Sequence, residues 1–262
     1  MSVSISYIGT AATILNINGV RFLTDPVFDA PQVYDMGIAK LEKTVGPSIP
    51  INELPPIDAV LLSHEDHPDN LDVTGRSLLP GRPVFTTMDG SKNLSDLPLV
   101  LGMASWDKTT VELQGQIFTI TATPCEHLEG GEVVGFVLEC DALGKGSNGK
   151  PNAVYFSGDT IYLPELKKLS EQWNIKIAMC CVGVATVPPF GNHTEPSKIT
   201  MDGKDLAQLS KEIKAEKIVP IHFEAWSHFK QNEEALRKDL SDAAIMDKVV
   251  WLPKDGKPVT IL

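Results

Sequence analysis

Four short apolar segments of this chain each run into a histidine or an aspartate that could bind a metal ion. Their composition is typical of buried β-strands, and a side chain that follows a strand lies in a loop at the edge of the sheet. Taken alone, each fits a plainer role, such as a turn histidine, an N-cap aspartate or a hydrogen-bonded core histidine. Together they favour strands whose ends meet at one metal site. The segments end at His64, His127, Asp159 and His222.

The remaining pattern indicates an α/β fold in which strands come first and helices interleave late. The opening strands are joined by Asn18-Gly19, a dipeptide that favours a type I′ hairpin turn. Apolar runs and alternation predict strands at Val3–Tyr7, Thr13–Ile17, Val20–Leu23, Ala59–Leu62, Val84–Thr87, Ile117–Ala122, Val133–Glu139, Val154–Ser157, Ile177–Val182, Val249–Leu252 and Val259–Leu262. Apolar residues three or four apart predict helices at Leu163–Trp173, Asp202–Lys214 and Asn232–Asp242.

We expect residues 1–262 to form one α/β domain made of two sheets with helices packed outside. The segment Asp25–Pro56 is rich in proline and glycine and is longer than an ordinary connection, so we interpret it as a lid over a functional site. The polar segment Gly144–Lys150 is typical of a flexible hairpin tip between two strands.

Composition limits the partners of the chain. The 262 residues (28.5 kDa) are 42% hydrophobic, which is enough for a sizeable core, and 23 basic against 34 acidic residues give a net charge of −11. This charge argues against nucleic acid and against anionic membrane surfaces as partners, and leaves a small molecule as the expected one. No signal peptide is predicted, because no early segment pairs a basic region with an apolar one, and no membrane span is predicted without an apolar run of about 18 residues. Four cysteines without CxxC spacing suit a cytosolic protein.

The first of the four segments continues into a dense cluster of donors, Ser63-His64-Glu65-Asp66-His67-Pro68-Asp69-Asn70. It offers two imidazoles and up to four side-chain oxygens directly after a strand. Imidazole and carboxylate together suit zinc, iron or manganese. The cluster alone also fits a solvated acidic turn.

These motifs resemble those of the metallo-β-lactamase-fold hydrolases and, within them, the branch of L-ascorbate-6-phosphate lactonase. The resemblance runs nearly from end to end of the chain. It implies a four-layer αββα sandwich with a mono- or dinuclear metal site at the edge where the strand-end loops meet. The motifs that carry it are the opening hairpin with Leu23-Thr24-Asp25-Pro26, Ser63-His64, Pro124–His127, Ser157-Gly158-Asp159-Thr160 and Pro220-Ile221-His222.

The chain departs from the family at the cluster itself, where the usual form is His-x-His-x-Asp-His. Here one residue is inserted, and Asn70 stands where the last histidine is expected. Aligned from the right, the resemblance implies a first metal held by His64, His67 and His127. It implies a second metal held by Asp69, His222 and a bridging Asp159.

The doubtful position in this ligand set is Asn70, which offers at best a weak neutral oxygen. A second site that lacks an imidazole is expected to bind more weakly, so a single-metal enzyme, or a metal other than zinc at the second site, stays open. An ungapped alignment would make Asp66 a ligand instead, but it would leave Asp69 without its usual role.

Several other residues are candidates for supporting roles. Asp25 is either an ordinary turn carboxylate or, by the resemblance, an acceptor that orients a metal-bound histidine. His193 and His228 lie in loops around the expected site, where they contact substrate or simply face solvent. Trp226 and Phe190 either line an apolar wall or pack the domain.

The leading functional hypothesis is metal-assisted hydrolysis with one or two divalent ions, zinc first, with manganese and iron as alternatives. Asp69 is expected to orient the attacking water and to pass a proton to the leaving group. A lactone or lactam is the preferred substrate, because the similar branch opens such rings and the acidic chain carries no basic clamp for phosphates.

Three alternatives stay open. The first is a metal-dependent phosphodiesterase, which a substrate panel separates from a lactonase. The second is oxidoreductase chemistry on a single iron, which some proteins of this fold perform. The third is a non-catalytic metal-binding protein that has lost activity with the missing histidine. RNA processing is disfavoured by the net charge.

Overall fold

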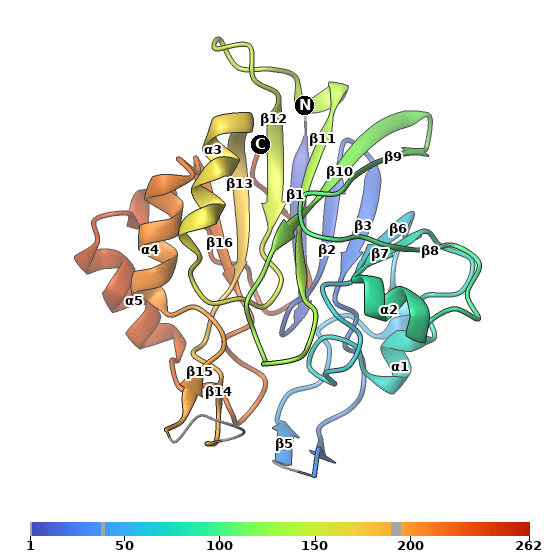
Figure 1. Cartoon of the computed structure of the whole chain (residues 1–262), viewed down its shortest axis with the longest axis vertical. Helices are drawn as coiled ribbons and strands as arrows, with labels where there is room; N and C mark the ends of the chain where they lie inside the picture. The colour runs from blue at the N-terminus through green and yellow to red at the C-terminus, as the bar shows by residue number, and fades with distance from the viewer. Residues whose placement is uncertain (1, 38–39, 190–194) are drawn as a thin grey trace.

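A computed structural model describes residues 2–37, 40–189 and 195–262 and contains two large stacked β-sheets with helices outside them (Figure 1). The first sheet has seven strands, in the order β17 (Val259–Thr260), β1 (Val3–Gly9), β2 (Ala12–Ile17), β3 (Val20–Thr24), β6 (Ala59–Leu61), β7 (Val84–Thr86) and β8 (Val100–Gly102). The second has six, in the order β16 (Lys217–Ile221), β13 (Asn174–Cys181), β12 (Asn152–Phe156), β11 (Val134–Cys140), β10 (Gln116–Pro124) and β9 (Lys108–Leu113).

Five α-helices in the described residues cover the outer faces of these sheets. Helices α1 (Val73–Arg76) and α2 (Met88–Asn93) lie on the side of the first sheet. Helices α3 (Lys168–Gln172), α4 (Gly203–Glu212) and α5 (Glu233–Asp242) lie on the side of the second. The predicted four-layer αββα sandwich is therefore confirmed. Four 3₁₀ segments accompany them, η1 (Ile51–Glu53), η2 (Asp141–Leu143), η3 (Pro164–Lys167) and η4 (Met246–Lys248).

The main core lies between the two sheets, because alternate strand residues point inward from both. Phe22 of β3 and Phe118 of β10 meet there edge to face, with ring centroids 5.0 Å apart. Two further apolar clusters lie outside the sheets. One packs β12 and β13 against α3, α4 and α5, and the other packs β3, β6 and β7 against residues around α1 and α2.

The strands that precede the predicted ligands point toward the same end of the sandwich. Strands β10, β12, β13 and β16 run in one direction within the second sheet. Strand β6 runs parallel to β3 and β7 in the first sheet. Two small hairpins lie at this end, at the bottom of Figure 1: β4 (Gln32–Asp35) with β5 (Lys40–Lys43), and β14 (Thr186–Val187) with β15 (Ser197–Lys198).

Most of the predicted elements are present, with two corrections. The type I′ turn is confirmed by positive φ at both Asn18 and Gly19. The expected strand Val249–Leu252 is absent, because only Val249 forms a bridge, to Ile218. The expected helix Leu163–Trp173 begins as the 3₁₀ segment η3 and becomes α-helical only at Lys168.

The segment interpreted as a lid does lie beside the predicted ligands, since its residues Met36 and Leu41 share a cleft with His67 and Asp69. Segment Asp25–Pro56 contains the β4–β5 hairpin, whose base is tied to the rest of the protein rather than free. Lys43 forms a buried ion pair with Asp72, Nζ to Oδ2 3.4 Å. The Thr44 amide donates to the Ala225 carbonyl, and the Ser227 amide donates to the Glu42 carbonyl.

Of the helices in the described part of the chain, none is long and apolar enough to span a membrane.

Replacing Phe118 by alanine tests the inter-sheet core. Phe118 is 0% exposed, and we expect the variant to lose about 3–5 kcal/mol of unfolding free energy through lost burial and a residual cavity. The neighbouring Ile117 points outward and is 64% exposed, so Ile117→Ala is the matched control and should change stability by at most about 1 kcal/mol. Urea unfolding of both measures the difference. Equal losses would contradict the assigned register.

Candidate metal centre and cleft

Three histidines converge at the ends of β6 and β10. His64 and His67 lie in the loop after β6, and His127 follows β10. His67 Nδ1 is 3.0 Å from His64 Nε2 and 3.3 Å from His127 Nε2. We call His64, His67 and His127 the histidine group.

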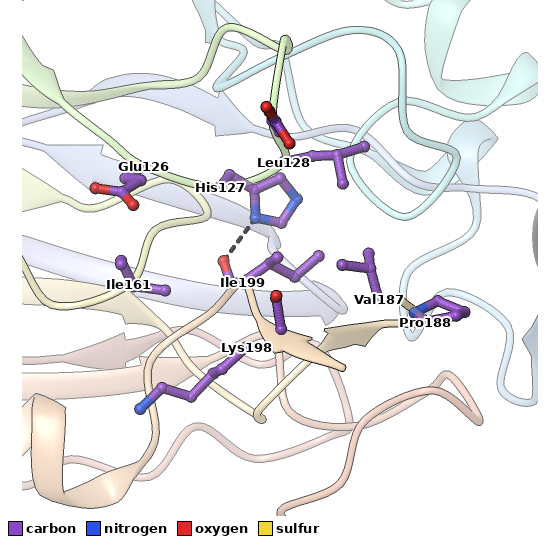
Figure 2. Close-up of a pocket in the computed structure, with 10 residues that line it drawn as sticks. Glu126, His127, Leu128, Ile161, Val187, Pro188, Lys198 and Ile199 are labelled. Carbon is purple, nitrogen blue, oxygen red and sulfur yellow. Dashed lines mark hydrogen bonds between the residues drawn. The ribbon is translucent and has the colours of Figure 1, made fainter. Parts of the chain in front are cut away.

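In two of these histidines, His64 and His127, the ring nitrogen Nδ1 points away from the group and already has a hydrogen-bond partner. His127 Nδ1 donates to the carbonyl of Ile199 at 2.7 Å, as Figure 2 shows. His64 Nδ1 is 2.9 Å from Ser63 Oγ, and that hydroxyl donates to Asp25 Oδ2 at 2.7 Å. With the protons on Nδ1, both rings turn a lone pair on Nε2 toward His67.

This arrangement fits a metal ion. The two lone pairs converge on His67 Nδ1, so either a proton on that nitrogen or a cation between the three nitrogens satisfies them. Zinc–nitrogen bonds of about 2.0–2.1 Å in a tetrahedron place neighbouring donors about 3.3 Å apart, close to the distances observed. Burial, together with His67 and His127, holds the pKa of His64 well below its usual value, so the ring is neutral as a ligand must be.

A second group combines two buried carboxylates with one imidazole. Asp69 lies in the loop after β6, Asp159 follows β12 and His222 follows β16. His222 Nε2 is 3.5 Å from Asp69 Oδ2 and 3.2 Å from Asp159 Oδ2. We call Asp69, Asp159 and His222 the carboxylate group.

The negative charge of the two buried carboxylates in this group also favours a bound cation. Buried carboxylates are costly unless positive charge or hydrogen bonds compensate them, and Asp159 Oδ1 has no hydrogen-bond partner. Burial lowers the pKa of His222, but Asp159 and Asp69 outweigh it and raise this pKa to about 9. A proton on His222 thus supplies part of the charge that a divalent ion would supply. The donor set, two carboxylates and one imidazole, suits zinc, manganese or iron.

The two groups match the two ligand sets that the resemblance implies, with the same six residues. That each group binds a metal stays a prediction. Asp66 is exposed and belongs to neither group among the described residues, which disfavours the ungapped alignment. The Asn70 amide donates to Asp25 Oδ2 at 3.0 Å, and its buried Oδ1 has no hydrogen-bond partner.

Glu65, between the first two ligands, anchors their loop, a role that the sequence did not reveal. Arg76 donates to its backbone carbonyl at 2.6 Å and to its carboxylate at 3.2 Å. Asn93 donates to the other carboxylate oxygen at 2.5 Å. Glu65 therefore fastens the histidine group to α1 and α2.

Both groups open onto one cleft of about 150 Å³, reached by His67, Asp69, His127 and Asp159. One wall is Met36 and Leu41 of the β4–β5 hairpin region. The opposite wall comes from Leu128 and the β14–β15 region, and no Lys or Arg is among the described residues that line the cleft. The sequence predicted that segment Asp25–Pro56 covers the site, but it did not reveal the short strands of either wall, because strands of two to four residues leave little periodicity.

The predicted substrate-contacting residues have different outcomes. His228 lines the cleft, and its Nε2 is 3.2 Å from Asp69 Oδ2. Trp226 does not line it, which corrects that prediction: the side chain is 4% exposed, donates from Nε1 to Thr10 Oγ1 at 2.9 Å and packs on Tyr34. His193 and Phe190 lie outside the described residues.

A second hollow, of about 250 Å³, lies beside the cleft and is drawn in Figure 2. It shares its apolar residues Leu128, Val187, Pro188 and Ile199 with the cleft, and His127 borders both. The thiols near Asp159 are poor nucleophiles, since burial raises the pKa of both Cys125 and Cys181.

Gly158, directly before Asp159, is required by its backbone conformation and by close packing. Its φ is +59°, and a Cβ there would lie 2.7 Å from the Val134 carbonyl oxygen and 2.9 Å from Ser63 Cβ. Gly149 in the hairpin tip has φ +80° but nothing within 4 Å. We expect Gly149→Ala to cost about 1–2 kcal/mol from φ alone, and Gly158→Ala distinctly more. Thermal unfolding of both variants measures this, and equal costs would contradict the close contact.

Metal content tests the two groups separately. We expect protein equilibrated with zinc to hold about two ions per chain, because both donor sets are complete enough to bind. His127→Ala and His222→Ala should each remove about one ion, whereas Glu126→Ala, at an exposed neighbouring position, should remove none. Elemental analysis after dialysis gives the ratio. Full metal content in both histidine variants would rule these ligand sets out.

Comparison with known proteins agrees with this fold. A family model described as "Beta-lactamase superfamily domain" matches residues 20–223. The chain is 26% identical over 234 residues to the N-acyl-phosphatidylethanolamine-hydrolyzing phospholipase D, mitochondrial, of Saccharomyces cerevisiae, covering 83% of this chain but 47% of that protein. This chain thus spans about half the length of the yeast relative. It is 24% identical over 264 residues to a UPF0173 metal-dependent hydrolase of Methanopyrus kandleri, covering 95% and 96% of the two chains.

Solved structures show the same architecture. The isothiocyanate hydrolase from Delia radicum gut bacteria superposes with a TM-score of 0.78 at 21% identity, over 98% of both chains. A possible metal-dependent hydrolase from Veillonella parvula superposes with a TM-score of 0.77 at 20% identity, over the full length of both. Because the family model covers most of the chain and these neighbours share its two-sheet architecture, the chain belongs to the beta-lactamase superfamily and has the metallo-β-lactamase fold.

Proposed function

We propose that the chain is a metal-dependent hydrolase that opens a cyclic ester or amide of a small, uncharged molecule. The observation that carries the proposal is the pairing of two complete donor groups with an apolar cleft that exposes both. Three imidazoles in the histidine group favour zinc there. The carboxylate group suits zinc, manganese or iron.

When bound, a divalent ion at these groups supplies Lewis acidity and activates water at neutral pH. The residues of the chain do the rest. Asp69 orients the attacking water, takes up its proton and returns a proton to the leaving oxygen or nitrogen. Burial raises the pKa of Asp69, but His222 and His228 outweigh it and hold the pKa well below its usual value, so the carboxylate is ionised and can bind a metal ion and accept a hydrogen bond from water.

The walls of the cleft support an uncharged substrate. Met36, Leu41, Leu128 and Val187 present apolar surface on two sides, which binds apolar substituents and excludes water from the reacting bond. An anionic phosphate would find no Lys or Arg among the described lining residues and would meet a chain of net charge −11.

A phosphodiesterase is the second candidate, because the yeast relative is named as a phospholipase D. Its identity of 26% to this chain is low, and the chain spans 47% of it. Hydrolysis of an isothiocyanate, another uncharged electrophile, belongs in the same panel because of the structural neighbour so named.

Turnover of matched substrates tests the proposal. We expect alkyl-substituted lactones to be opened faster than bis(p-nitrophenyl) phosphate. His64→Ala and Asp69→Asn, each shown to be folded, should lower lactone kcat/KM by about 100-fold or more, because each removes a ligand or the proton acceptor. Glu126→Gln is the control. Preference for the phosphodiester would favour the second candidate, and wild-type lactone turnover by His64→Ala would end the proposal.

A further inference from the structure

Asp69 of the carboxylate group lies next to Asn70, which stands where the family pattern has a histidine. Asp69 belongs to this group, yet the residue beside it, Asn70, turns its amide away to Asp25. No imidazole therefore reaches Asp69 from its own loop on that side. A histidine from a different loop lies against it.

That histidine is His228. Its Nε2 is 3.2 Å from Asp69 Oδ2, and its side chain is 15% exposed. It lies six residues after His222 in the loop that follows β16. One loop thus brings two imidazoles to the same carboxylate oxygen, with His222 Nε2 at 3.5 Å.

Aromatic packing fixes the His228 ring. Phe229 lies 4.4 Å from it and Trp226 5.9 Å, measured between ring centroids. Phe229 also packs on His222 at 4.7 Å, so the two imidazoles share one neighbour. Trp226 is held by its hydrogen bond to Thr10, which anchors the loop to the first sheet.

We propose that His228 positions Asp69: its Nε2–H donates to Asp69 Oδ2 and holds that carboxylate toward Asp159 and His222. This inference rests on the proposed function to the extent that the carboxylate group binds a metal. His228 is a positioning residue and not a fourth ligand. Donors on one ion with bonds of about 2.1 Å lie at most about 4.2 Å apart. The described donors that all lie within 4.8 Å of one another are Asp69, Asp159 and His222, without His228.

Cobalt titration of the full chain, followed by visible absorption, tests the inference without any substrate. The variants are His228→Ala, which removes the donor, and His228→Gln, whose side-chain Nε2 lies the same number of bonds from the backbone. Thr186→Val, on the cleft wall, is the matched control. We expect His228→Ala to weaken the second cobalt equivalent about 10–100-fold and to leave the first unchanged. His228→Gln should restore the affinity to within about threefold, and Thr186→Val should behave as wild type.

Four results would overturn the inference. In His228→Ala, these are an unchanged affinity for the second cobalt equivalent or the loss of both equivalents. In the wild-type protein, it is the uptake of only one equivalent. In His228→Gln, it is a protein that unfolds at the wild-type temperature yet binds cobalt as weakly as His228→Ala. The last would mean that an imidazole ligand is needed. Failure of the proposed function looks different, because a protein that shows the expected cobalt pattern but hydrolyses no lactone contradicts that function alone.

Discussion

The geometry of the candidate metal centre depends on the hydrogen bonds that the buried carboxylate of Asp25 accepts. It accepts hydrogen bonds from the Ser63 amide and hydroxyl, both at 2.7 Å, and from the Asn70 amide at 3.0 Å. These bonds fix both ends of the segment that carries His64, His67 and Asp69. Burial raises the pKa of Asp25 to about 7, against the lowering effect of these bonds. One carboxylate thus holds the segment that contributes ligands to both groups, an arrangement in which residues behind the metal ligands orient them.

The fold supplies the rest of the site by placing parallel strand ends together. Strands β6, β10, β12 and β16 come from both sheets and deliver histidines and aspartates to one end of the sandwich, while the two small hairpins add apolar walls. Rigid strands position the ligands, and the hairpin regions shape the space above them. Chemistry and substrate choice therefore reside in different parts of the chain, as is common when loops carry specificity on a fixed scaffold.

The sequence predicted the two-sheet architecture and the four donors His64, His127, Asp159 and His222, because strand periodicity and strand-end donors are local signals. The choice of His67 and Asp69 to complete the two ligand groups came from the resemblance to the family. It could not show that Asn70 binds Asp25, since that contact joins residues 45 positions apart. Nor could it show that Trp226 is buried, which depends on Thr10 at the other end of the chain. The contact of His228 with Asp69 joins two loops that lie far apart in the sequence. The anchoring role of Glu65 depends on two helices that are too short to predict. The similarity to the lactonase branch stays a prediction.

Anomalous diffraction from crystals equilibrated with zinc, recorded at the zinc absorption edge, tests the central claim most directly. The account predicts one peak about 2.0–2.1 Å from His64 Nε2, His67 Nδ1 and His127 Nε2, and a second peak bound by Asp69, Asp159 and His222. A zinc ion bound elsewhere, with the histidine group making no metal contact, would contradict it.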